Sequence, residues 1–315
     1  MKRYIFLLCL IFGFVKTEYE RNSAIEIMVA IFGKEFFNKN NMTIKENKSL
    51  QYDQEEKLPY YNNEEFEHCD CGPVYNNQER IHKGKDVNPL YKYPWAVYIN
   101  YTKNGDKAFC TGSIIHENYV LTAAHCFLLG NTPEEGIIDI DTVKIFVGNF
   151  SLSPLDDIEN VTQIVQINKI IFHEEVNLKF WENDIALLRL SKPLDLKSHK
   201  EIKSICLPSP SVTDVEKMTT IGWGATGPKE KKYPKMLHEA QFLVINRCRN
   251  PYTHSLDYQH LCILGDPKAS SLCKGDSGGP TMRIKNGRYE VVGITSFTPE
   301  FDGICFSSSK PSYLE

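Results

Sequence analysis

The sequence predicts an all-β domain, and two observations support that prediction. Beyond Gly84 the chain alternates short β-type runs with turns and shows no long helical periodicity. Asn104-Gly105 and Asn286-Gly287 each separate two β-type runs. Asn-Gly favours a type I′ turn, because both central residues of that turn need a positive φ. We therefore expect a hairpin at each of these two pairs.

The β-type runs themselves are short, rich in β-branched and aromatic residues, and bounded by turn residues. We expect strands at Trp95 to Tyr101, Tyr119 to Thr122, Val143 to Val147, Val161 to Phe172, Ile185 to Leu190 and Glu239 to Ile245.

The chain changes character near residue 80. Residues 1–17 have a basic start and an apolar stretch too short to span a bilayer, which is typical of a secretory signal peptide. Residues 18–80 are rich in Asn, Glu, Lys and Tyr, and we expect them to form a largely disordered propeptide. Residues 81–315 would form the folded domain. The net charge of −4 gives no reason to expect nucleic acid or a membrane surface as a partner.

Three motifs offer a nucleophile, a base and an orienting carboxylate. Ser277 stands between small residues in Gly275–Pro280, His125 precedes Cys126, and Asp184 opens an apolar run. A serine hydroxyl is a weak nucleophile that needs a neighbouring base and a third group to orient that base. A zinc site is not expected, because His125 and Cys126 lack a second pair of ligands at a usual interval.

The order His, Asp, Ser and the residues around each motif resemble the chymotrypsin-like (trypsin-family) serine endopeptidases, from about Ile81 to the last residue. The resemblance implies two six-stranded antiparallel β-barrels, with His125 and Asp184 on the first and Ser277 on the second. It implies peptide-bond hydrolysis through an acyl-enzyme, with the amides of Gly275 and Ser277 as the oxyanion hole. Neither a metal nor an organic cofactor is needed.

The segment around Arg80 and Ile81 resembles the activation junction of the family. Cutting after Arg80 would free an ammonium group on Ile81, which could enter the body and pair with the carboxylate of Asp276. His82 and Lys83 replace the usual Val and Gly, so we expect weaker insertion. The partners implied are protein or peptide substrates, a trypsin-like activating protease and secreted protease inhibitors.

The cysteines suit an oxidising, extracellular destination. Cys9 lies in the signal peptide, and Cys69 would compete with Cys71 for its partner, link two molecules or stay free. Met218 and Arg283 occupy the two positions where many family members carry a further bridge. The pairs implied by the resemblance are Cys110–Cys126, Cys248–Cys262, Cys273–Cys305 and Cys71–Cys206.

The specificity pocket is also read from the resemblance. Ser271 occupies the base of the pocket, where trypsin-like members carry Asp, and Leu272 follows and narrows the space. Ser296 and Thr298 match the strand that lines the pocket, and Ser312 stands where Gly is usual. This set is similar to the elastases. We expect cleavage after Ala, Val or Leu, with a chymotrypsin-like preference second and a trypsin-like one third.

Asn100 and Asn149 begin Asn-x-Ser/Thr sequons, and we expect both to be glycosylated near hairpin tips.

The end of the chain departs from the family. Family members continue beyond the position of Ser312 and finish with a helix, so we expect that C-terminal helix to be missing. Either the sequence is incomplete, or the protein has become something other than a working protease. With the altered entry after Ile81, this favours an alternative: a secreted, weak or inactive protease homologue that acts by binding. The intact His125, Asp184 and Ser277 favour the enzyme.

Overall fold

The computed structural model describes residues 71–75, 85–87, 89, 91–148, 150–152, 161–208, 215–225, 233–249, 256–264, 272–297 and 312–314. All of them belong to one compact unit, Asp70–Glu315. The predicted signal peptide and most of the predicted propeptide lie outside these residues. Within the described part of the chain, no helix is long and apolar enough to cross a membrane.

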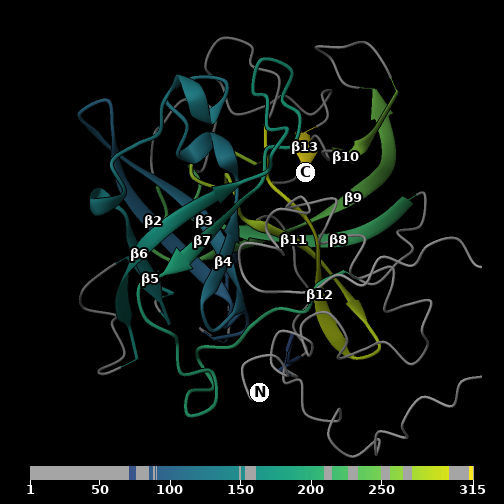
Figure 1. Ribbon diagram of the computed structural model, residues 1–315. Helices are drawn as coiled ribbons and strands as arrows, with labels where there is room; N and C mark the ends of the chain where they lie inside the picture. Colours follow the sequence, from purple (N-terminus) through teal and green to yellow (C-terminus); the bar gives the residue numbers. More distant parts are fainter. Residues whose placement is uncertain are drawn as a thin grey trace, which may run out of the picture. The chain divides into compact units, whose positions relative to one another are not determined.

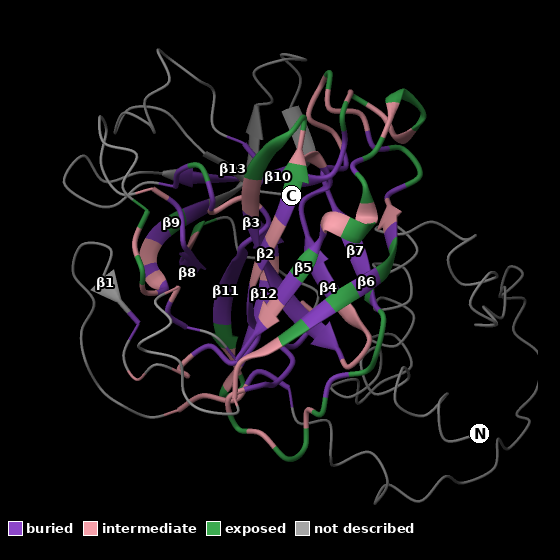
Figure 2. Cartoon of the chain, turned by 90° about the vertical axis from the view of Figure 1, so that its left-hand side faces the viewer, coloured by how far each residue is buried: buried purple, intermediate pink, exposed green. Residues whose placement is uncertain are grey.

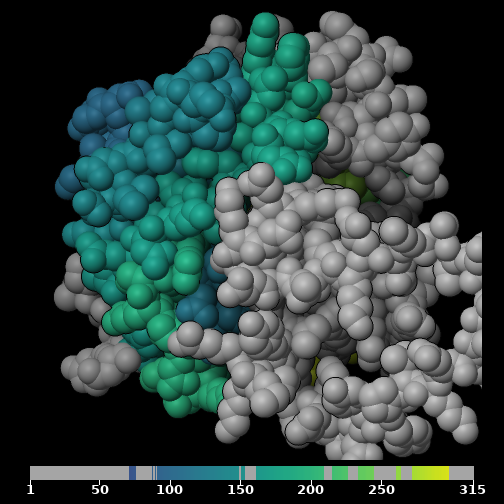
Figure 3. Space-filling view, in the orientation of Figure 1, coloured from purple at the N-terminus to yellow at the C-terminus, as the bar shows by residue number. Residues whose placement is uncertain are grey.

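Six strands of the first half close into an antiparallel barrel in the order β2-β3-β4-β7-β6-β5 (Figure 1). Their residues make up one continuous face of the described surface, coloured blue to teal in Figure 3. Three short 3₁₀ helices lie in the connection between β4 and β5: η2 (Ala124–Cys126), η3 (Pro133–Glu135) and η4 (Ile140–Thr142). The strands are β2 (Ala96–Lys103), β3 (Asp106–His116), β4 (Tyr119–Thr122), β5 (Lys144–Val147), β6 (Gln163–Phe172) and β7 (Ala186–Leu190).

The strands of the second half form one seven-stranded antiparallel sheet, in which β1 pairs with β9 and the remaining six follow the path β12-β11-β8-β9-β10-β13. Among the described residues the two ends of this path, β12 and β13, do not pair, so the sheet is a half-barrel. The expected second closed barrel is therefore seen only in part. The strands are β1 (Lys85–Asp86), β8 (Val215–Gly222), β9 (His238–Arg249), β10 (Leu256–Leu264), β11 (Pro280–Lys285), β12 (Arg288–Ile294) and β13 (Ser312–Leu314).

Both Asn-Gly hairpins are confirmed. Asn104 and Gly105 join β2 to β3 with φ of 52° and 85°, and Asn286 and Gly287 join β11 to β12 with φ of 51° and 75°. The positive φ at both central positions is what a two-residue hairpin needs to match the twist of its strands. The all-β prediction is confirmed with them.

The core of the first barrel lies inside the closed wall of strands. Figure 2 colours β4 and β7 largely as buried, whereas β6 alternates between buried and exposed residues. Alternation of this kind is what a strand with one solvated face produces. The largest buried side chains here include Trp95, Ile99, Ile114, Leu187 and Leu188.

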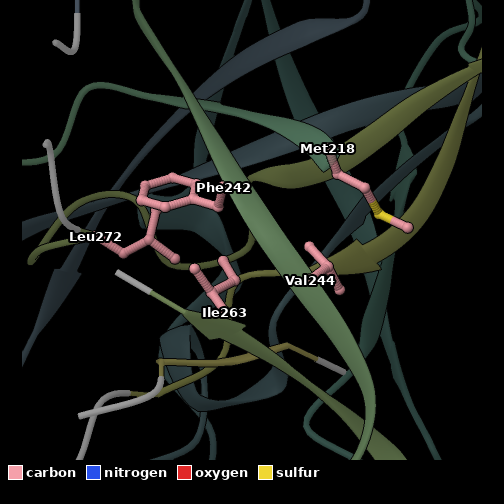
Figure 4. Close-up of a cluster of buried hydrophobic side chains, with 5 residues drawn as sticks. All are labelled: Met218, Phe242, Val244, Ile263 and Leu272. Atoms are coloured by element: carbon pink, nitrogen blue, oxygen red, sulfur yellow. The ribbon is translucent and has the colours of Figure 1, made fainter. Parts of the chain in front are cut away.

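A second cluster of buried side chains fills the inner face of the second sheet (Figure 4). Burying such a side chain stabilises the fold by about 1.5–3 kcal/mol. Leu272, predicted to narrow the specificity pocket, belongs to this cluster and points toward Phe242 and Ile263. The cluster consists of Met218, Phe242, Val244, Ile263 and Leu272.

Arg283, at one of the two positions where the resemblance implies a further disulfide in many family members, is buried. Its Nη1 lies 3.2 Å from a carboxylate oxygen of Glu216, and its Nε lies 3.2 Å from one of Glu290. Two carboxylates thus neutralise a charge that would be costly to bury alone.

The predicted propeptide is fixed to the folded body at Cys71 by the expected Cys71–Cys206 disulfide, with Cα atoms 5.1 Å apart. Gly72 adds backbone contacts on two sides: its N–H donates to Ser204 O, and its carbonyl accepts from Tyr289 N, both at 2.8 Å. A cut after Arg80 would therefore leave this part of the chain attached.

Replacing Gly72 with alanine is expected to destabilise the protein more than the same change at Gly105. Both glycines have positive φ, +57° and +85°, and the left-handed conformation costs an L-residue about 1–2 kcal/mol. Only at Gly72 would the new Cβ also collide, because it would lie 2.2 Å from the carbonyl oxygen of Tyr289, whereas nothing lies within 4 Å at Gly105. Thermal unfolding should give the lower Tm for Gly72→Ala. Equal Tm values would contradict the close fit.

Candidate active site

Two predicted site residues meet at one edge of the first barrel. His125 lies in η2, just after β4, and Asp184 lies just before β7. β4 and β7 are antiparallel neighbours, with Thr122 opposite Ala186. The residues that follow β4 therefore lie close to the residues that precede β7. The ring Nδ1 of His125 lies 2.7 Å from Asp184 Oδ2, and the backbone N–H of His125 donates to Asp184 Oδ1 at 2.8 Å.

Asp184 is completely buried, with no exposed surface. Besides the two contacts with His125, its Oδ2 accepts a hydrogen bond from the hydroxyl of Ser296 at 2.5 Å. Ser296 follows β12 and so belongs to the second half of the fold. A buried carboxylate is tolerated when hydrogen bonds satisfy it, and here both halves of the fold supply them.

The turn that carries Ser277 packs against the same barrel edge. The carbonyl of Ser277 accepts from Thr111 N at 2.8 Å. A Cβ added to Gly278, whose φ is +78°, would lie 2.1 Å from Thr122 Oγ1 and 2.9 Å from Ala123 N. Only glycine allows the turn to approach the strand end next to His125 this closely.

The hydroxyl of Ser277 and the imidazole of His125 are not hydrogen-bonded in this structure. His125 Nε2 lies 4.0 Å from Cys126 Sγ. The structure thus joins His125 to Asp184 directly and brings the turn of Ser277 beside them.

The two amides predicted to form an oxyanion hole lie on this turn. The neighbouring amides are occupied, since Asp276 N donates to Cys273 O and Gly278 N donates to Thr295 O. Within the described part of the chain, the amides of Gly275 and Ser277 donate to no acceptor. Gly275 has φ of 102°, and a Cβ there would lie 2.4 Å from the ring of Phe109, so this position also requires glycine.

Asp276 has an enclosed carboxyl group. A Cβ on Gly222 or Gly224 would lie within 2.2 Å of its oxygens, and these oxygens accept from Gly224 N at 2.8 Å and Cys273 N at 2.9 Å. Burial raises the pKa of Asp276 to about 6, although the two backbone hydrogen bonds act in the opposite direction. No Lys, Arg or His among the described residues forms an ion pair with it.

Two of the four expected disulfides are confirmed in full. Cys110–Cys126, with Cα atoms 6.5 Å apart, fixes η2 to β3, and Cys71–Cys206 is described above. Cys262 and Cys273 are each disulfide-bonded, while their expected partners, the side chain of Cys248 and residue Cys305, lie outside the described part. Cys110, Cys126 and His125 come close enough to suggest a metal site, but the two sulfurs are bonded to each other and offer no thiolate.

The remaining predicted positions are only partly described. Ser296 was predicted to line the pocket, and its hydroxyl donates to Asp184. Asn100 lies within β2, paired with Phe109 and Lys144, and therefore not at a hairpin tip. Outside the described residues lie Arg80, Ile81, Asn149, Ser271, Thr298 and the side chain of Ser312.

Sequence reasoning missed Trp181. Its φ of 55° is rare for a bulky residue, and its ring lies 5.5 Å from the ring of His125 and 4.9 Å from that of Phe297. The carbonyl of Trp181 lies 2.6 Å from Nε2 of the buried His260. Closeness to Asp184 in the chain was the only signal that could have drawn attention to it.

Sequence reasoning also missed Lys103, the last residue of β2. Its Nζ donates to the backbone carbonyl of His125 at 2.8 Å. The Asn-Gly pair that follows predicts where the strand ends but not where this side chain lies.

Comparison with known proteins agrees with this geometry. The family model described as Trypsin matches residues 81–306. A curated relative, the CLIP domain-containing serine protease B4 of Anopheles gambiae, is 33% identical over 234 residues, which is 69% of this chain. The match spans 62% of that relative's length, less than two thirds. The fold, the His125–Asp184 pair and the family match all agree, and the chain therefore belongs to the trypsin family of serine proteases.

Proposed function

We propose that the protein is a secreted serine endopeptidase, made as a zymogen, that hydrolyses peptide bonds in protein substrates. The observation that carries the proposal is the buried Asp184 carboxylate bound to His125, next to a glycine-rich turn that holds Ser277. This arrangement contains the three groups that acyl transfer by a serine needs.

In the proposed reaction, Ser277 attacks the carbonyl carbon of the scissile bond while His125 accepts the hydroxyl proton. His125 then gives a proton to the leaving amine, and water hydrolyses the acyl-enzyme by the same route in reverse. Asp184 holds the imidazole with Nδ1 toward the carboxylate. The amides of Gly275 and Ser277, which donate to no acceptor among the described residues, would stabilise the oxyanion.

Activation by a cut after Arg80 accounts for the environment of Asp276. The enclosed carboxyl has two backbone donors and no cation among the described residues. A new ammonium group on Ile81 would supply that cation, and the ion pair would then hold the turn of Gly275 and Ser277 in its working shape. The activating enzyme would be a trypsin-like protease, because the cut follows arginine.

For substrate choice we propose an elastase-like pocket. Ser271 stands in place of an acidic residue, so the pocket would lack the charge that attracts a Lys or Arg side chain of the substrate. The side chains of Thr298 and Ser312 would leave little room for an aromatic ring. Leu272 and Ser296 would shape the pocket indirectly. Leu272 packs in the second hydrophobic cluster, and the hydroxyl of Ser296 is hydrogen-bonded to Asp184.

Treating the secreted protein with trypsin is expected to switch on labelling by a fluorophosphonate probe, because the probe needs an activated serine. Ser277→Ala should abolish labelling, and Arg80→Gln should keep the protein uncut and unlabelled. In-gel fluorescence after removal of immobilised trypsin measures this. Cleaved, folded protein that stays unlabelled would instead favour the binding homologue.

A peptide library cut by the activated enzyme is expected to show cleavage after Ala, Val or Leu, as the small, uncharged pocket favours. Mass spectrometry of the products, with Ser277→Ala as the blank for residual trypsin, measures the preference. Dominant cleavage after Arg or Lys would refute the pocket assignment.

The uncut protein is expected to lose stability as the pH rises from about 4 to about 6. The pKa of Asp276 is about 6 in the folded chain against 3.8 for an ordinary Asp, so the folded state binds more protons between these values. Below about pH 4 the carboxyl is protonated in both states and costs no stability. At neutral pH its ionisation in the folded state has lowered the free energy of unfolding by about 3 kcal/mol. Urea unfolding of the wild type and Asp276→Asn across this range measures the difference.

The cut after Arg80 should weaken this pH dependence, because an ammonium partner favours the ionised carboxylate. The same pH dependence in the wild type and in Asp276→Asn would show that Asp276 is not responsible.

A further inference from the structure

Lys103 places an ammonium group at the helix that carries His125. It is the last residue of β2, where an Asn-Gly turn leads into β3, and its side chain is half-buried. Its Nζ donates to the carbonyl of His125 at 2.8 Å. An ammonium group has three donors and no acceptor, so this bond uses one of three.

The charge of Lys103 has no carboxylate within ion-pair distance among the described residues. Asp106 stands directly opposite it in the β2–β3 ladder, yet the two are not paired. Two other shielded cations in the fold are neutralised: Lys92 lies 2.7 Å from Glu239, and Arg283 has two carboxylate neighbours.

Burial lowers the pKa of Lys103, and the negative charge of Asp184 acts in the opposite direction. The lowered pKa records a cation that the protein desolvates without fully compensating it. A negative group arriving from outside would therefore find an ammonium with two further donors and no carboxylate partner among the described residues.

The contacts around His125 show which part of a substrate would pass here. His125 Nε2 must reach the leaving nitrogen in order to protonate it, and Nε2 lies 4.0 Å from Cys126 Sγ of the Cys110–Cys126 disulfide. The hydroxyl of Tyr101, two residues before Lys103 on β2, lies 3.3 Å from Cys110 Sγ. The leaving-group side of the substrate thus starts beside this disulfide, which β2, the strand that ends at Lys103, contacts through Tyr101.

We infer that Lys103 is a specificity-determining residue that binds an acidic side chain on the leaving-group side of the substrate, at the first or second residue after the scissile bond. The inference rests on the proposed function and extends it to a second selective contact, separate from the specificity pocket.

Internally quenched peptides that differ only by Glu or Gln at one of these two positions test the inference in the trypsin-activated protein. The wild type should cleave the Glu peptide with a kcat/KM about fivefold higher at low salt, the size expected for one partly shielded ion pair. Lys103→Met should bring the Glu-to-Gln ratio close to one, and Lys103→Arg should keep it above one. Taking the ratio within each variant cancels any loss of folded enzyme.

Lys107 is the matched control, because it is an exposed lysine on the same hairpin, opposite Thr102. Lys107→Met should keep the wild-type ratio. Charge reversal in Lys103→Glu should turn the preference from a Glu peptide to a Lys peptide at the same position, with Ser277→Ala as the blank.

A wild-type ratio of one at both positions, or a ratio unchanged by Lys103→Met, overturns the inference while leaving the proteolytic function intact. Failure of the activated wild type to cleave any peptide and to react with the fluorophosphonate probe overturns the proposed function, and this inference with it.

Discussion

The burial of the Asp184 carboxylate is the constraint on which the site depends. With no exposed surface, this charge is tolerated only if protein donors replace water. The donors come from the backbone and ring of His125 and from the hydroxyl of Ser296. Because Ser296 lies in the second half of the fold, satisfying one carboxylate requires both halves to be in place.

Glycines provide a second constraint of a steric kind. Gly275 and Gly278 both have positive φ, and a side chain at either position would collide with Phe109 or with Thr122 and Ala123. The turn can approach the barrel edge only as a bare backbone, and this close approach brings Ser277 next to the strand end that carries His125. Within the described residues, the site is thus held by strand ends and by a tight turn.

Two charges near the site lack a full partner among the described residues. The carboxyl of Asp276 is enclosed by glycines and backbone amides, and the ammonium of Lys103 is held by a single carbonyl. Each suggests a partner that arrives later: for Asp276 the chain terminus made by the proposed cut, and for Lys103 an acidic substrate residue. The buried Arg283, with its two carboxylates, shows the contrasting case of a charge compensated within the fold.

The sequence by itself determined the local features of this protein. The Asn-Gly pairs specified both hairpins, because asparagine and glycine tolerate the positive φ that the turns need. The motifs around His125, Asp184 and Ser277 led to the right family. Only the tertiary structure decided which side chains meet: Leu272 in the second core cluster, Ser296 on Asp184, Trp181 beside His125 and Lys103 on its carbonyl. Turn preferences are properties of adjacent residues, whereas these contacts depend on strand register and barrel closure, which bring distant segments together.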